Sequence, residues 1–121
     1  MNARPLLVLT IALSLFLTAC IQKHVVRLDR GADRVKIYKS DPPEEFEYID
    51  EVKVVSGEGC GAFGLVGTYD SARNMLRNRT LKMGGTAARI DEITEPYLDP
   101  GGSCRHNEYI IRASIYRLKE E

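Results

Sequence analysis

The sequence has no excess of either charge: 17 basic and 17 acidic residues give a formal net charge of +0. Proteins that bind nucleic acid neutralise several phosphates with Lys and Arg, and such a basic field is missing here. The sequence also lacks an apolar run of the roughly twenty residues with which a helix crosses a bilayer. Its 121 residues are enough for one domain. We therefore expect a single small domain that does not bind nucleic acid.

The longest apolar stretch lies near the start of the chain, from Leu6 to Leu17, with Arg4 before it. A positive start, a short apolar core and small residues at its end are typical of a secretory signal peptide. The alternative is a buried first helix of the domain. We interpret residues 1–19 as a signal peptide that is removed.

The end of this stretch, Leu17-Thr18-Ala19-Cys20, resembles the lipobox of bacterial lipoproteins. In that family the Cys thiol receives diacylglycerol, the chain is cut before the Cys, and the new amine receives a further acyl chain such as palmitate. Two or more chains hold a protein firmly in a membrane, whereas one binds marginally. The resemblance implies lipidation of Cys20. Ile21, where Asp would signal retention, implies sorting to the outer membrane.

Residues 20–32 would then be the lipidated Cys and a short tether, and residues 33–121 the domain. The tether is neither Pro-rich nor Gly/Ser-rich, so neither stiffness nor great flexibility is expected of it. Fully extended, it would reach about 40 Å from the anchor. We expect the domain to stay close to the membrane, on its periplasmic side or at the cell surface.

Two cysteines remain, Cys60 and Cys104. In an oxidising compartment an even pair predicts a disulfide. This bridge would close a loop of about 45 residues and contribute roughly 4 kcal/mol in the chain-entropy model. The alternative is a metal or redox pair, but Cys-x-x-Cys spacing is missing and only His106 is close. We therefore predict a structural disulfide and no metal or other cofactor.

Alternating apolar residues predict strands, of which the last is the clearest: Tyr109, Ile111, Ala113 and Ile115 share one face. A bend is expected near Ile49-Asp50 in the second strand. The predicted strands cover residues 34–40, 45–55, 86–94 and 107–118.

A helix is predicted between the second and third strands. Asp70 or Ser71 would cap its start, and Gly84-Gly85 would end it. Its apolar face would consist of Ala72, Met75, Leu76 and Met83. The predicted fold class is α+β: a small antiparallel sheet in the order β-β-α-β-β, with the helix packed on one face.

The loop "GCGAFG" at 59–64 satisfies the pattern G-x-G-x-x-G. Nucleotide binding would require a helix that starts inside the motif and a parallel βαβ unit. Because the predicted helix begins about six residues too late, we interpret the glycines as turn residues. The loop is our candidate partner-contact surface, through Gly59, Gly61, Phe63 and Gly64.

No catalytic arrangement stands out, and we predict that the protein is not an enzyme. The nearest candidate is Asp99, Ser103 and His106, which share one turn-rich loop without the context of a nucleophile elbow. A small envelope hydrolase or ligand-binding protein that uses loop 99–108 is the alternative function.

Three segments, "VKIYKSDPPEEFEYIDEVKVVSGEGC", "ARNMLRNRTLKMGGTAARID" and "GGSCRHNEYIIRASIYRL", resemble the globular domain of the RcsF-like outer-membrane lipoproteins of an envelope-stress pathway. The resemblance covers residues 33–118. It implies that Cys60 and Cys104 match one of the two disulfides of that family. It also implies an envelope protein as partner and a function in stress sensing.

Two family features are missing. No further cysteine exists for the second disulfide, and the long proline-rich linker is absent. In the family that linker is associated with threading through outer-membrane β-barrel proteins. We expect a lipoprotein that binds another envelope protein, without the threading that a long linker permits.

Overall fold

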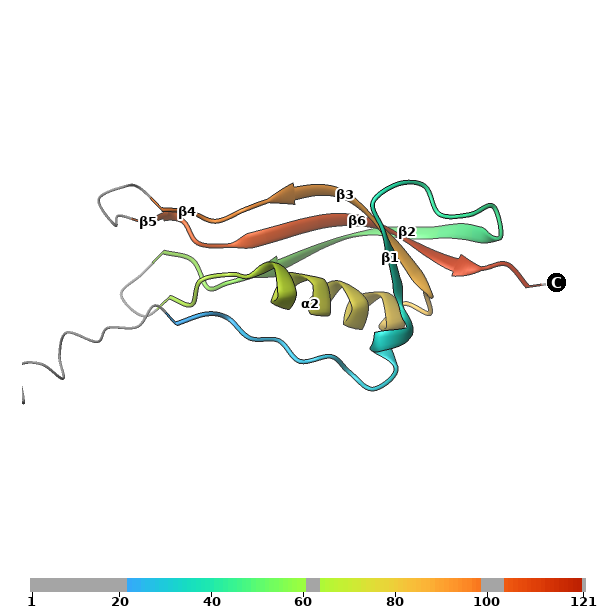
Figure 1. Cartoon of the computed structure of the whole chain (residues 1–121), viewed down its shortest axis with the longest axis horizontal. Helices are drawn as coiled ribbons and strands as arrows, with labels where there is room; N and C mark the ends of the chain where they lie inside the picture. The colour runs from blue at the N-terminus through green and yellow to red at the C-terminus, as the bar shows by residue number, and fades with distance from the viewer. Residues whose placement is uncertain (1–21, 61–63, 99–103, 121) are drawn as a thin grey trace, which may run out of the picture.

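One α-helix, one short 3-10 helix and two sheets form the fold in the computed structural model, which describes residues 22–60, 64–98 and 104–120. Figure 1 shows the long strands running side by side with the helix beneath them. The elements are η1 (Ala32–Arg34), β1 (Lys36–Tyr38), β2 (Phe46–Ser56), α2 (Tyr69–Lys82), β3 (Ala87–Thr94), β4 (Tyr97–Leu98), β5 (Cys104–His106) and β6 (Tyr109–Leu118).

The main sheet has the strand order β1-β3-β6-β2. The predicted α+β class with one helix on a four-stranded sheet is confirmed, but the prediction of an antiparallel sheet is wrong. The strands β2 and β3 each pair antiparallel with β6, whereas β1 pairs parallel with β3. The sheet is therefore mixed.

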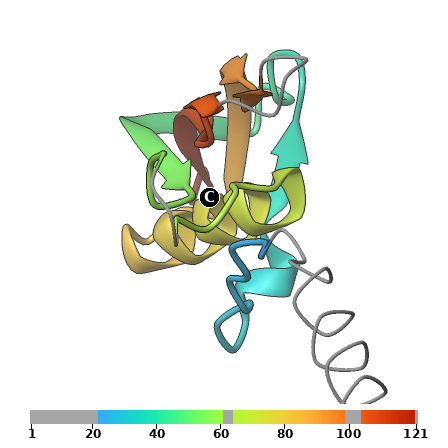
Figure 2. The same ribbon diagram turned by 90° about the vertical axis from the view of Figure 1, so that its left-hand side faces the viewer.

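The prediction of an antiparallel sheet fails at the connection between β1 and β2. A hairpin would place these strands side by side, but they lie at opposite edges of the sheet (Figure 2). Pro42-Pro43 lies in the connection, where a tight two-residue turn is not formed. Ile37 of β1 instead lies opposite Ala88 and packs against the core. The predicted element order also misses β4 and β5, which form a separate two-stranded sheet.

Two details of the predicted strands are confirmed. The register between β2 and β6 shifts between Tyr48 and Asp50, which is the bend expected from the sequence. The apolar face predicted for β6 is buried, and Ile111, Ala113 and Ile115 are fully inaccessible to solvent.

The helix α2 begins slightly earlier than the sequence predicts. Its N-cap is Thr68, whose hydroxyl accepts a hydrogen bond of 3.2 Å from the main-chain N–H of Ser71. Thr68 is extended, and its oxygen satisfies one of the free N–H groups of the first turn. The predicted end is confirmed, because the residue after the C-cap Met83 is Gly84, with a left-handed φ of 77°.

The core lies between α2 and one face of the sheet. Leu76 and Ala72 of the helix are fully buried against Ile111 and Ile115 of β6, with Met75 and Met83 partly buried beside them. Each large aliphatic side chain removed from water contributes about 1.5–3 kcal/mol.

A third layer covers the other side of the helix. Residues 22–30, which we call the strap, run in extended form beneath α2 on the side away from the sheet (Figures 1 and 2). The strap starts at the end of the molecule that carries residues 57–60, residues 64–67 and β5, and the strand β6 ends at the opposite end. The helix is therefore enclosed between the sheet and the strap.

Candidate functional site

The strap is held by a polar stripe on α2. The hydroxyl of Ser71 donates to the main-chain oxygen of His24 at 2.6 Å and accepts from the N–H of Val26 at 3.1 Å. One turn further on, the side-chain amide of Asn74 donates to the oxygen of Val26 at 2.9 Å.

The next turn of the helix repeats this pattern. The amide nitrogen of Asn78 donates to the oxygen of Arg27 at 2.9 Å, and its oxygen accepts from the N–H of Asp29 at 2.7 Å. Residues 71, 74 and 78 follow helical spacing and therefore lie on one face. Because they bind main-chain groups, this face of α2 recognises an extended backbone and not a particular strap sequence.

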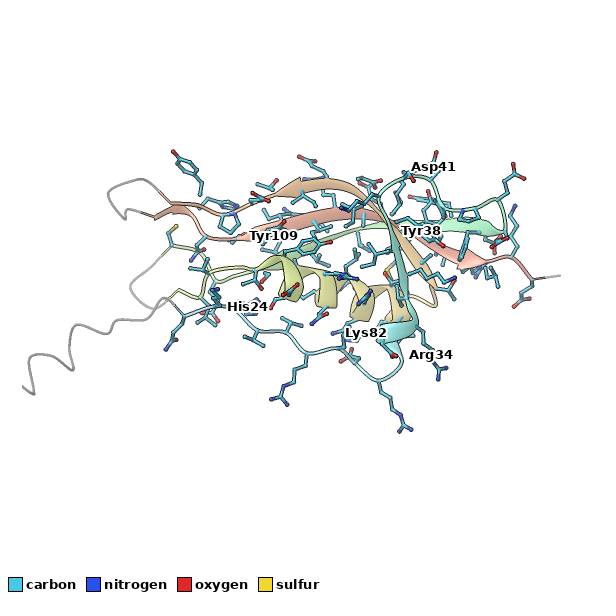
Figure 3. The ribbon with its side chains drawn as sticks, in the orientation of Figure 1. His24, Arg34, Tyr38, Asp41, Lys82 and Tyr109 are labelled. Atoms are coloured by element: carbon cyan, nitrogen blue, oxygen red, sulfur yellow. The ribbon has the colours of Figure 1, made fainter. Side chains whose placement is uncertain are left out.

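His24 joins the strap to the end of β2. Its Nδ1 accepts the main-chain N–H of Gly57 at 3.1 Å and lies 2.9 Å from the hydroxyl of Ser56. Because a main-chain N–H can only donate, Nδ1 carries the lone pair. The hydroxyl of Ser56 in turn accepts the N–H of Thr68 at 3.2 Å. Figure 3 shows His24 at the start of the strap, beside the first turn of the helix.

A short parallel bridge completes the attachment. The N–H of His24 donates to the oxygen of Val66, and the N–H of Val66 donates to the oxygen of Gln22. The range predicted as a tether is thus bound to the domain from Gln22 onwards. It cannot extend the reach of the domain from an anchor unless these bonds break.

The backbone of the glycine loop packs closely against neighbouring backbone atoms. A Cβ on Gly64 would lie 2.1 Å from the carbonyl oxygen of Gly59, and one on Gly67 would lie 1.9 Å from that of Ser56. Gly59 also has a left-handed φ of 82°. A Cβ is therefore excluded at Gly64 and Gly67, and a side chain at Gly59 would be strained. Both results agree with the interpretation of the glycines as turn residues. The other two predicted contact residues, Gly61 and Phe63, lie outside the described residues.

The predicted disulfide partners lie near the same end. Asn107 donates a hydrogen bond through Nδ2 to the carbonyl oxygen of Gly59, so the chain beside Cys60 meets the chain that follows β5. The side chain of Cys104 lies outside the described residues, so the bridge stays a prediction. The predicted lipidation site, Cys20, lies outside them as well.

Of the predicted hydrolase residues, the structure describes only His106, in β5. Its Nε2 is buried and has no hydrogen-bond partner among the described residues. Asp99 and Ser103 lie outside these residues, so no triad can be built. Within the described part of the chain, His, Cys, Asp and Glu side chains nowhere gather in a group of three that could hold a metal ion.

The face of the sheet opposite α2, the open face, carries a polar cluster around Arg89. Its guanidinium donates to Asp91 at 2.8 Å and to Asp41, which comes from the connection between β1 and β2. The hydroxyl of Ser114 donates to Asp91 at 2.7 Å and accepts from Arg89 at 3.3 Å. The hydrogen bonds from Arg89 to Asp91 and Asp41 raise the pKa of Arg89, so it stays charged. In Figure 3, Asp41 lies above the sheet, on the side away from the helix.

Aromatic rings extend this face toward the C-terminal end. Tyr48 and Tyr116 lie opposite each other in the register, with ring centroids 5.9 Å apart in an edge-to-face arrangement. Tyr38 and Phe46 form a similar pair at 6.0 Å. Tyr48 remains more than half exposed. The open face therefore combines ion pairs with accessible aromatic surface.

No family model, curated protein or solved structure matches this chain. Among the described residues, no helix is both long enough and apolar enough to cross a membrane. The fold and its surfaces are therefore the basis for any statement about function.

Sequence reasoning missed the stripe of Ser71, Asn74 and Asn78. The signal was present, because these three polar residues recur at helical spacing opposite the predicted apolar face. It was overlooked because a polar helix face normally indicates solvent. The cluster around Arg89 had no signal of this kind, since its members are brought together by strand pairing.

Proposed function

We propose that this chain is an outer-membrane lipoprotein, anchored at Cys20, whose domain binds another envelope protein at the membrane surface. The docked strap is the observation that supports this proposal. It holds Gln22 against Val66, and two residues of extended chain span only about 7 Å, so an anchor at Cys20 would keep the domain on the membrane. This geometry suits a partner in the same membrane.

The predicted contact loop has a suitable position for such a partner. Residues 57–60 lie at the end of the molecule where the strap begins, and Glu58 is exposed there. A function in envelope-stress sensing, as in the RcsF-like family, belongs to the same proposal. It would have to operate without a long linker, through contact at the membrane.

The disulfide between Cys60 and Cys104 is part of this proposal. The hydrogen bond from the Asn107 side chain to the carbonyl oxygen of Gly59 supports it, because it brings the segment after β5 to the residue before Cys60. A disulfide needs Cα atoms about 4.4–6.8 Å apart. Mass analysis of the unreduced mature protein should show two hydrogen atoms fewer than after reduction. Equal masses would refute the bridge.

Lipidation is tested on the protein in its native host. Globomycin should cause an unprocessed precursor to accumulate, and mass spectrometry of the mature protein should find acyl chains on Cys20. Cys20→Ser should release the domain from the membrane fraction. Membrane attachment that is unchanged in this variant would contradict the proposal.

Partner binding is tested by a photo-crosslinking residue placed at Glu58 in intact cells. We expect one discrete crosslinked species of constant mass, whereas the same residue at exposed Arg112 on the open face should not give it. Identical patterns from both positions would argue against a partner at the loop.

A further inference from the structure

The outer side of the strap differs from the side that faces α2. Exposure alternates along the extended chain: His24 and Val26 are half-buried, whereas Lys23, Val25 and Arg27 are exposed. Val25 is 77% exposed, the largest value among the exposed large hydrophobic side chains of the described residues, and Leu28 is 38% exposed. The strap therefore presents apolar side chains to the surroundings although it is well bound to the domain.

Cations flank these apolar side chains. Lys23, Arg27 and Arg30 are exposed and form no ion pair with the described residues. Asp29 is the only carboxylate of the strap, so three cations and one carboxylate give residues 22–30 a formal net charge of +2, with His24 neutral. The strap is thus basic in a chain whose overall net charge is +0.

Exposed aliphatic side chains among Lys and Arg are typical of segments that lie in a membrane interface. The apolar groups enter the boundary between headgroups and acyl chains, and the long basic side chains reach the phosphates. Such cations are attracted to anionic lipids within about a Debye length of the surface. A protein surface could accept the same charges, but the position of the strap favours lipid, because the predicted lipidated residue lies two positions before Gln22.

We propose that the outer side of the strap, formed by Lys23, Val25, Arg27, Leu28 and Arg30, lies on an anionic phospholipid surface. This inference rests on the proposed anchor at Cys20 and adds an orientation to it. The strap and helix layers face the bilayer, and the open face of the sheet points away from it. The bonds from Ser71, Asn74 and Asn78 make the strap a rigid part of the domain, so contact with lipid fixes the whole domain.

The absence of Trp from the sequence permits a direct test. Val25→Trp places the single Trp of the protein on the outer side of the strap. The acylated protein is placed in vesicles of phosphatidylcholine alone or with added phosphatidylglycerol, each with and without a brominated phospholipid as quencher. We expect a blue-shifted emission and strong quenching in the anionic vesicles, both reduced by high salt.

Two variants provide the controls. Tyr48→Trp places the same fluorophore on the open face, where quenching should be absent in both lipid compositions. Arg27→Glu with Arg30→Glu in the Val25→Trp background should reduce the ratio of quenched to unquenched protein at least about tenfold, because each cation near an anionic surface strengthens binding about fivefold. Circular dichroism checks that this variant is folded.

The outcomes separate this inference from the proposed function. An acylated Val25→Trp protein whose emission is unquenched in anionic vesicles would overturn the strap contact and leave the anchor intact. Equal quenching of the Val25→Trp and Tyr48→Trp proteins would overturn the orientation. If mass analysis finds no acyl chain, the proposed anchor fails. The same quenching, measured after vesicles are added to that protein, then decides whether the strap binds lipid.

Discussion

The hydroxyl of Ser71 donates a hydrogen bond of 2.6 Å to the main-chain oxygen of His24, which lies 47 residues earlier in the chain. The same hydroxyl accepts the N–H of Val26 at 3.1 Å, so one helical side chain binds the backbone on both sides of Val25. This pair converts a segment expected to be a tether into a third layer of the fold. It also determines which side of Val25 is left exposed.

Removal of the two hydrogen bonds that Asn78 makes to the strap should loosen the strap at Arg27 and Asp29. Asn78→Ala deletes one donor and one acceptor and should lower the free energy of unfolding by about 1 kcal/mol, since both bonds are exposed. Hydrogen exchange of the Asp29 amide should accelerate. Asn78→Asp is the matched variant, because it keeps the acceptor for the Asp29 N–H and loses only the donor. Protection of the Asp29 amide that is unchanged in Asn78→Ala would contradict the docked strap.

The turn after α2 should not accept a methyl group at its second glycine. A Cβ on Gly85 would lie 2.6 Å from Cγ2 of Ile115 and 2.8 Å from Cγ2 of Thr80, both fully buried. Gly85→Ala should therefore reduce stability by about 1–3 kcal/mol, measured by urea denaturation.

Gly84 provides the comparison, because nothing lies within 4 Å of a Cβ there and the cost comes from its left-handed φ of 77°. Gly84→Ala should cost about 1 kcal/mol, and Gly84→Asn less, since Asn tolerates this conformation. A Gly85→Ala protein that is as stable as Gly84→Asn would show that the packing around Ile115 is looser than described.

The open-face cluster should depend on the buried hydroxyl of Ser114. Ser114→Ala leaves Asp91 and Arg89 each one hydrogen bond short and should lower the free energy of unfolding by about 1 kcal/mol. Exposed Ser40 serves as the control, and Ser40→Ala should have no measurable effect. Equal stability of the two variants in urea would show that the cluster contributes nothing to folding.

Stability should decline in alkaline solution because of Tyr109. Its burial, together with the nearby charge of Glu95, raises the pKa of the Tyr109 phenol above the ordinary value of 10.0. The folded state therefore holds this proton to higher pH than the unfolded state does. The contribution is fully present below pH 10.0 and is lost as pH rises through the folded pKa.

Urea denaturation between neutral and strongly alkaline pH measures this decline. Tyr109→Phe should flatten it, and Tyr48→Phe, at an exposed ring, should leave it as in the unchanged protein. Figure 3 shows Tyr109 between the sheet and the start of the helix, where its ring packs edge-to-face against Tyr69 with centroids 5.8 Å apart. A decline that persists in Tyr109→Phe would assign it to another group.

The sequence by itself determined the helix, the four strands of the main sheet and the core. Alternation in β6 located Ile111, Ala113 and Ile115 on the buried face, and helical spacing located Ala72 and Leu76 opposite them. These signals are strong because burial of an apolar face is decided within one element, by a period of two or 3.6 residues. The bend near Ile49-Asp50 was readable for the same reason.

Only the tertiary structure decided which elements lie side by side. The parallel pairing of β1 with β3, the cluster of Arg89 with Asp41, and the docking of His24 on Ser71 join residues far apart in the chain. No local pattern specifies such partners, because polar side chains and backbone groups can pair with water equally well until packing excludes it. The surfaces that we propose for contact with a membrane and with a partner follow from that packing.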